Sequence, residues 1–568
     1  FAYDGWAHSG LAWQPPTAKT PFTTVEAEIL QALLVSRLIE PIKDKENDGF
    51  GCGFERCGRT DAGVSSSGQV INLWVRSDLE DPMGTGAGKA PAECEMIEAC
   101  GAITQVDKRS GEEDRPASPT GSATSSLEST KSENIIRRKP ASSVEIPYVT
   151  ILNKHLPPTV RILAWSPVSP TFSSRYSCIW RHYKYFFSTS PSAPFLSSRF
   201  DFGSAYADAD QTAEWQRRLA QADFKQLELD VDLMRDALRR LVGEHDFRNL
   251  CKVDAPKQLT THVRTVISAS IDRVAGEGED MFVLNLRGGA FLYNQVRHIV
   301  ALLFLVGARL ETPDVVDRLL WTSDRTPSTE ALQATTRPDE PPASREVMDG
   351  KPGYSMADDL PLILWECGFN GTELNWRVDN APLHSDSSSD VKVNTSGLHA
   401  AAKMASDPVE SFRRHFLEMN ENWTHQRLKA LIGKHHLSSL ASHAPVHPPR
   451  SETPSPLPTR PPSPSPSNKK RPGVPRSSPV VFTPHGAGLY TKTISYIPVL
   501  KKVRNDPPDV QNARWAAGRG AARMEKRVQN KAKSDADRIR NLAVKAEAQR
   551  LSKESEGKAA EGHAMESG

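Results

Sequence analysis

An aspartate follows an arginine by two residues inside a turn bracketed by two glycines, in the segment CGRTDAGVSS of residues 57–66. Gly58 and Gly63 permit a sharp bend and allow a ligand to approach the backbone closely. A carboxylate beside the permanent charge of Arg59 stays ionised, so Asp61 can act as a nucleophile or a base. The alternative is an aspartate that only caps the turn, which is a common use of this residue type.

Arg297 is the second candidate catalytic residue. An almost wholly apolar run, Ile299–Val306, follows it. Such a run predicts a buried helix, here over residues 291–309. An arginine in a buried helix needs a carboxylate partner, since an unpaired buried charge is strongly destabilising. Tyr293 precedes Arg297 by four residues and is expected on the same helical face. The alternative is a surface arginine at the start of the helix.

Both residues belong to sequence blocks that resemble the TruA family of tRNA pseudouridine synthases. The segment around Asp61 resembles the family's signature G-R-T-D-x-G, in which the aspartate is catalytic. The segment around Arg297 is similar to G-x-x-F-L-Y-x-x-V-R-x-I. The matching segments keep the family's order along the chain: 1–14, 58–64, 172–185, 241–247, 289–299 and 360–369. The resemblance therefore covers about two thirds of the chain.

The resemblance implies a role for each matched residue. Asp61 is expected to be the catalytic carboxylate, Arg297 to pair with it, and Tyr183 to lie against the target uracil. Stacking on an extruded base contributes ~1–3 kcal/mol, although a tyrosine of the sheet core is the alternative for Tyr183 and more so for Tyr185. The residues predicted to bind substrate or RNA are Arg59, Arg175, Arg181 and Tyr293. Arginine suits such contacts because it stacks on bases and binds phosphate with two N–H groups.

The expected reaction converts a uridine of tRNA into pseudouridine and needs neither a metal nor a small-molecule cofactor. Ser65 stands where many bacterial members carry histidine, and residues 247–254 resemble the eukaryotic branch that modifies tRNA positions 38 and 39 in the anticodon stem-loop. Two alternatives stay open: other uridines in tRNA or another RNA, and a catalytically inactive tRNA-binding protein. tRNA is the predicted partner, no membrane association is expected, and a homodimer is left open.

The composition predicts a single catalytic core with disordered additions. The chain has 568 residues with 43 prolines, a mean hydropathy of −0.49 and a net charge of +2, so any RNA-binding charge must be local. The seven cysteines include no C-x-x-C pair, which favours reduced thiols in the cytoplasm or nucleus and argues against a zinc site. The chain begins inside a strand-like motif without Met, so a missing N-terminal segment is expected.

Hydrophobic periodicity predicts the helices and strands that carry the candidate residues. A helix over 21–40 is expected to start with a capping box of Thr23 and Glu26. Further helices are predicted at 231–242, 291–309 and 312–321, and strands at 50–58, 69–76, 160–165, 180–187, 261–273 and 280–287. This mixture indicates an α+β fold. The family resemblance implies two α/β halves that share a central, mostly antiparallel sheet.

Changes in composition divide the chain into core segments and additions. The core is expected at 1–80, 144–322 and 353–375, with a disordered insertion at 81–143 and a polar insertion at 323–352. A mostly disordered linker is predicted at 376–489, a basic extension at 490–550 and a disordered tail at 551–568. The basic extension fits a solvated helix and an RNA-contacting segment equally well.

Overall fold

The structure is a computed structural model of the chain. The residues that it describes are 1–14, 20–40, 52–79, 145–189, 227–277, 280–323, 346–379, 381–382, 408–442, 481–518, 520–522 and 525. The predicted insertion at 81–143, most of the insertion at 323–352 and the tail at 551–568 therefore lie outside the described residues. Among the described residues, no helix is long and apolar enough to cross a membrane.

The fold is a mixed α+β arrangement around a large sheet, as the sequence predicted. The strand order of this eight-stranded sheet is β5-β1-β3-β10-β6-β9-β8-β7. The strands are β1 (Ala2–Tyr3), β3 (Ser65–Ser66), β5 (Val160–Arg161), β6 (Trp180–Ser188), β7 (Gly243–Asp246), β8 (Val263–Arg273), β9 (Met281–Gly288) and β10 (Leu362–Gly368). Strand β3 pairs with β10 in parallel, whereas β6 pairs antiparallel with both β10 and β9. The sheet is therefore mostly antiparallel.

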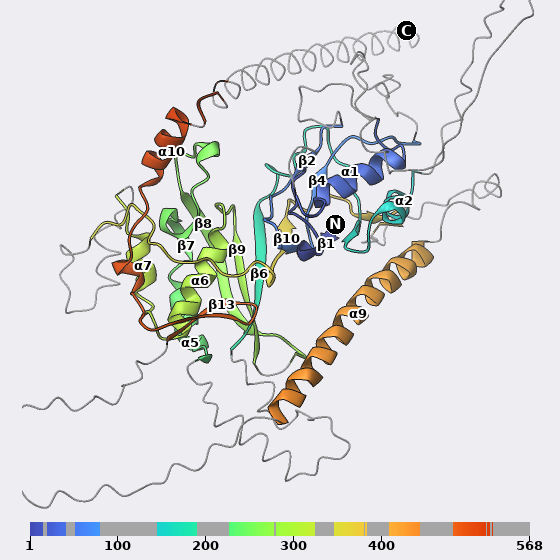
Figure 1. Ribbon diagram of the computed structural model, residues 1–568. Helices are drawn as coiled ribbons and strands as arrows, with labels where there is room; N and C mark the ends of the chain where they lie inside the picture. The colour runs from blue at the N-terminus through green and yellow to red at the C-terminus, as the bar shows by residue number, and fades with distance from the viewer. Residues whose placement is uncertain are drawn as a thin grey trace, which may run out of the picture. The chain divides into compact units, whose positions relative to one another are not determined.

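The chain divides into two compact units, and the first contains residues 1–225, 271–289 and 358–470. Its helices α1 (Val25–Val35) and α2 (Tyr148–His155) pack against each other, and their apolar faces form one core with β1 and β5. A separate two-stranded sheet, β2 (Glu55–Arg56) with β4 (Ile71–Asn72), flanks the segment that carries Asp61. These elements are blue to cyan in Figure 1.

The start of α1 differs from the predicted capping box. Thr24, and not Thr23, is the N-cap, and its hydroxyl accepts a hydrogen bond from the Ala27 N–H at 3.3 Å. Glu26 is fully buried, where it accepts from the Trp13 N–H at 2.7 Å and forms an ion pair with Arg56. Glu26 therefore ties α1 to β2 instead of capping the helix.

The second unit contains residues 226–270, 290–357 and 471–568. Its central helix, α6 (Gln295–Gly307), is buried along its whole length and packs against α5 (Val231–Arg239) and the hairpin strand β13 (Val481–Gly486). The remaining elements are α7 (Val315–Leu320), β14 (Leu489–Thr493) and α10 (Pro508–Ala517). Part of the predicted basic extension is thus folded onto this unit, with Val499 fully buried.

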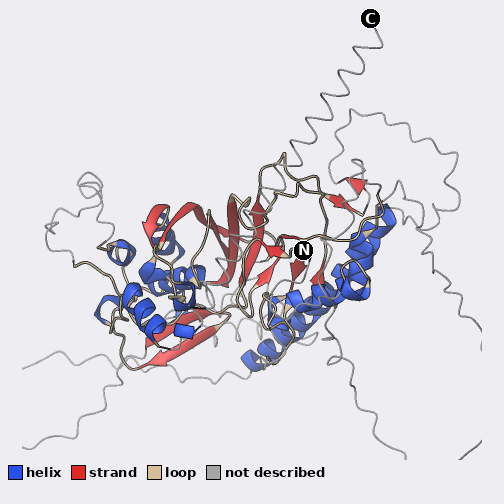
Figure 2. Cartoon of the chain, turned by 90° about the horizontal axis from the view of Figure 1, so that it is seen from above, coloured by secondary structure: helices blue, strands red, loops and turns tan. Residues whose placement is uncertain are grey.

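The expected linker at 376–489 contains more structure than its composition predicted. A helix of 35 residues, α9 (Pro408–Ser442), runs unbroken through it, as Figures 1 and 2 show. A short hairpin, β11 (Arg377–Val378) with β12 (Ala381–Pro382), precedes the helix. Helix α9 contacts the first unit through Asn422, which donates to Asp4 at 3.1 Å, and through Glu418, which lies 3.4 Å from Arg161. The prediction of a mostly disordered linker did not anticipate this helix.

Candidate active site

Asp61 lies in a turn between β2 and β3 that the backbone defines closely. The Val64 N–H donates to the Asp61 carbonyl at 3.2 Å, and Gly63 adopts a φ of 82°, which L side chains rarely reach. The base of the turn is held by the Cys57 N–H, which donates to Val70 O at 2.9 Å, and by the Gln69 amide, which donates to Gly58 O at 2.9 Å. Gly63 thus serves the bend that the sequence predicted.

The opening segment of the chain packs directly on this turn. The Tyr3 hydroxyl lies 2.6 Å from the Thr60 hydroxyl, and the Gly5 N–H donates to the Ser65 hydroxyl at 2.9 Å. A Cβ atom at Gly5 would overlap the backbone of Val64. Gly5 is therefore required for the close approach, and Ser65 is a positioning residue whose role the sequence did not reveal.

The turn combines a buried residue with residues that solvent and a ligand can reach. Asp61 is half-buried, Thr60 is buried and Arg59 is exposed. Arg175 is exposed as well, and its guanidinium carbon lies 5.2 Å from the ring centroid of Tyr176. Exposed guanidinium groups are available to phosphate, so the predicted RNA contacts of Arg59 and Arg175 stay predictions that fit the structure.

Tyr183 lies on β6, in the middle of the sheet of the first unit. It is opposite Leu364 of β10 and Leu286 of β9, and only 9% of its surface is exposed. Burial raises the pKa of the Tyr183 hydroxyl far above its ordinary value, with a further contribution from nearby Cys367. Tyr185, two residues on, is fully buried and belongs to the core. A stacking role therefore requires the uracil to reach the small exposed part of Tyr183.

Arg181 makes contacts that differ from the predicted RNA binding. Its guanidinium donates to three backbone carbonyls, those of Gly289 at 2.7 Å, Cys57 at 2.8 Å and Arg175 at 3.1 Å. These bonds connect β6 to the Asp61 turn, to the end of β9 and to the segment that carries Arg175. We interpret Arg181 as a positioning residue within the first unit.

Arg297 belongs to the second unit, where it lies in the first turn of α6 and is 8% exposed. Its Nε–H donates to the Ala357 carbonyl at 2.7 Å, and the Arg297 carbonyl accepts from the Ala357 N–H at 3.1 Å. The alternative of a surface arginine is therefore wrong. The pairing of Arg297 with Asp61 stays a prediction.

Tyr293 does not share a helical face with Arg297. Helix α6 begins at Gln295, and its N-cap Asn294 has a left-handed backbone with φ 57°. Tyr293 precedes this cap, is 38% exposed, and has the Lys252 Nζ 5.5 Å from its ring centroid. Its predicted contact with the substrate rests on this exposure and not on helical spacing.

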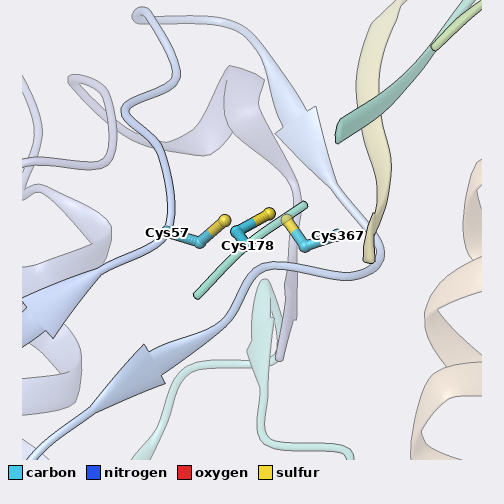
Figure 3. Close-up of side chains that lie close together, drawn as sticks. All are labelled: Cys57, Cys178 and Cys367. Carbon is cyan, nitrogen blue, oxygen red and sulfur yellow. The ribbon is translucent and has the colours of Figure 1, made fainter. Parts of the chain in front are cut away.

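Three cysteines that are far apart in the sequence meet beside the Asp61 turn. Cys57, Cys178 and Cys367 place their sulfur atoms within 4.8 Å of one another, and Figure 3 shows the three side chains pointing together. Hydrogen bonds among the three thiols lower the pKa of Cys178 and raise the pKa values of Cys57 and Cys367. The sequence has no C-x-x-C pair, so the meeting of these three cysteines was not predicted. All three are free thiols, two of them buried and one half-buried. The available signal was that each lies in or beside a block that matches the family.

Comparisons with known proteins agree with this reading of the chain. A family model described as tRNA pseudouridine synthase matches residues 237–347. The human tRNA pseudouridine(38/39) synthase is 31% identical over 386 residues, which cover 66% of this chain and 56% of the relative. The protein of the same name from Saccharomyces cerevisiae is 32% identical over 378 residues, or 66% of this chain and 58% of the relative. The chain thus spans little more than half the length of these two relatives.

A further relative is matched over more of its length. A probable tRNA pseudouridine synthase of Caenorhabditis elegans is 30% identical over 391 residues, which cover 68% of this chain and 70% of the relative. On this similarity, the chain belongs to the tRNA pseudouridine synthase family.

Proposed function

We propose that this protein isomerises uridine to pseudouridine in the anticodon stem-loop of tRNA, at positions 38 and 39. The relatives named tRNA pseudouridine(38/39) synthase support the choice of these positions. The observation that carries the proposal is the construction of the Asp61 turn. Its backbone is fixed by the opening segment of the chain, while the Asp61 side chain itself stays half-buried.

The proposed reaction needs few catalytic groups from the protein. The bond between uracil N1 and ribose C1′ breaks, the base turns, C5 bonds to C1′, and the proton lost from C5 is balanced by one gained at N1. Asp61 is the proposed nucleophile: a carboxylate oxygen bonds to ribose C1′ as the N1–C1′ bond breaks, and this C–O bond breaks again when C5 bonds to C1′. A carboxylate is most effective in this role when it is ionised and held in place. Arg297 is proposed to pair with it, and Tyr183 to contact the uracil after the nucleotide leaves its stack.

Binding of tRNA is proposed to rest on local positive charge. Arg59 and Arg175 are exposed in the first unit, and Tyr293 with Lys252 is exposed in the second. Phosphate contacts of this type supply affinity without sequence information. We further propose a cytoplasmic or nuclear location, where the substrate tRNA is found, and leave a homodimer open.

Pseudouridine mapping on defined transcripts tests the proposal. The full chain is incubated with a tRNA transcript that carries uridine at 38 and 39, and with matched transcripts that carry cytidine at one or both positions. Product at these positions alone is the expected result. Product at other uridines would favour a different target, and tight tRNA binding without product would favour an inactive tRNA-binding protein.

A further inference from the structure

The cluster of Cys57, Cys178 and Cys367 has the composition of a metal site. Cys57 and Cys178 are 2% and 9% exposed, and Cys367 is half-buried. Their sulfur atoms lie within 4.8 Å of one another. Among the described residues, these three cysteines form a group of side chains close enough together to hold one metal ion. Thiolates bound to one zinc ion lie about 2.3 Å from the metal, which places neighbouring sulfurs about 4 Å apart. The three side chains therefore need only small movements to share an ion.

The segments that carry the three cysteines explain why they meet. Cys57 follows β2 at the base of the Asp61 turn, Cys178 precedes β6, and Cys367 lies in β10. Strands β6 and β10 are paired, with Cys367 opposite Arg181. Arg181 then donates to the Cys57 carbonyl at 2.8 Å, which brings the third segment to the same place.

We propose that Cys57, Cys178 and Cys367 form a three-thiolate site for a thiophilic metal ion, with Zn²⁺ as the ion of choice, that fastens the base of the Asp61 turn to β6 and β10. Thiolate ligands select soft and borderline ions over Mg²⁺ or Ca²⁺. Three protein ligands leave the fourth tetrahedral position to a water molecule. Water can reach this fourth position beside Cys367, which is half-buried. The proposed role of the ion is structural, because it would join three separate segments of the chain.

Charge supports the assignment. One Zn²⁺ with three thiolates carries a net charge of −1, and burying that charge requires a compensating cation. Arg181 lies opposite Cys367 in the pairing of β6 with β10, and its guanidinium donates to the Cys57 carbonyl at 2.8 Å, so its positive charge lies beside the cluster. Arg181 is thus the counter-ion of the proposed site as well as a link between the strands.

A disulfide between two of these cysteines is the competing use of the cluster. It would consume two thiols and leave the third free, whereas a metal site uses all three. A disulfide and a metal site differ in the number of thiols that are protected from modification, two or three. They also differ in whether an oxidant or a metal ion is needed for that protection.

Cobalt binding to the full chain, purified in reductant and freed of metal, tests the site without tRNA. We expect one equivalent of Co²⁺ to produce the intense thiolate-to-cobalt charge-transfer absorption, and Zn²⁺ to displace it. Cys178→Ser should weaken binding by about tenfold or more. The matched control is Cys251→Ser, which removes a cysteine that is 1% exposed and lies outside the cluster. Cys251→Ser should bind Co²⁺ as the wild type does. Zn²⁺ should raise the melting temperatures of the wild type and of Cys251→Ser, but not that of Cys178→Ser.

Several results would overturn the site. Wild-type protein without thiolate–cobalt absorption, or a Cys178→Ser variant with the same affinity as the control, contradicts it. So does peptide mapping that finds a disulfide among the three cysteines in freshly purified protein. Asp61→Asn should bind Co²⁺ like the wild type, so failure of the proposed function and failure of the metal site are distinguishable.

Discussion

Gly5→Ala is expected to damage the Asp61 turn from outside it. A Cβ atom at this position would overlap the Val64 carbonyl carbon and oxygen, and both are backbone atoms that cannot rotate away. The only relief is separation of the opening segment from the turn, at the expense of the hydrogen bond from the Gly5 N–H to Ser65. Overpacking of this kind costs about 1–3 kcal/mol in the free energy of unfolding.

The effect on catalysis should exceed the effect on stability. Displacing a reacting group by about 1 Å can lower turnover on the order of a hundredfold. Relieving the overlap between a Cβ atom at Gly5 and the Val64 backbone requires a shift of about 1 Å. We therefore expect turnover at saturating tRNA to fall by about that factor, while the affinity for tRNA changes little.

Urea unfolding and single-turnover pseudouridine formation measure the two effects. Gly371→Ala is the matched control, because nothing lies within 4 Å of a Cβ atom there and the residue belongs to the same unit. If Gly5→Ala and Gly371→Ala agree within about twofold in turnover and within the error of unfolding, the reasoning about the turn is refuted.

Three further changes test other parts of the account. Deleting residues 85–140 should leave stability and turnover nearly unchanged, because Glu145 already joins the ends of the insertion through Ser77 at 2.6 Å; loss of folded protein would contradict this. Truncation after residue 480 should lower the melting temperature, because it removes the buried Val499, whose N–H donates to Glu311 at 2.6 Å; unchanged stability with a flatter salt dependence of tRNA binding would assign the tail to RNA instead. Burial lowers the pKa of His298 from 6.5 to about 3, so the stability contributed by its neutral form is fully present above pH 6.5 and is lost as the pH falls towards 3. His298→Gln should therefore reduce the pH slope of the unfolding free energy between these values by up to ~1.4 kcal/mol per pH unit. An unaltered slope would contradict the effect of burial on His298.

Strongly periodic segments were predictable from the sequence alone. The alternation in β6, β8 and β9 and the apolar run of α6 each predicted the correct type of element, with ends that differ by a few residues. Local choices between neighbouring residues were not predictable. Thr23 and Thr24 both suit an N-cap, and the left-handed backbone of Asn294 removes Tyr293 from the helix that its spacing indicated.

Long-range features were the least visible in the sequence. The contacts of Arg181 and the meeting of the three cysteines depend on strand pairing between distant segments, which no local pattern encodes. Helix α9 was missed for a different reason. Phe412, Phe416, Met419 and Trp423 recur at spacings of four, three and four residues, which is a helical pattern that the polar composition of the surrounding segment obscured.

Turnover by Asp61→Asn tests directly whether the Asp61 carboxylate carries out the isomerisation. Asparagine keeps the shape of the side chain and removes its charge, so the turn and its contacts with Tyr3 and Gly5 should survive. We expect single-turnover pseudouridine formation to fall by more than about a hundredfold, because a positioned catalytic group contributes about 10²–10⁴-fold. The affinity for tRNA should stay nearly constant, because it is spread over many phosphate contacts. Turnover within about tenfold of the wild type would show that Asp61 does not carry the reaction.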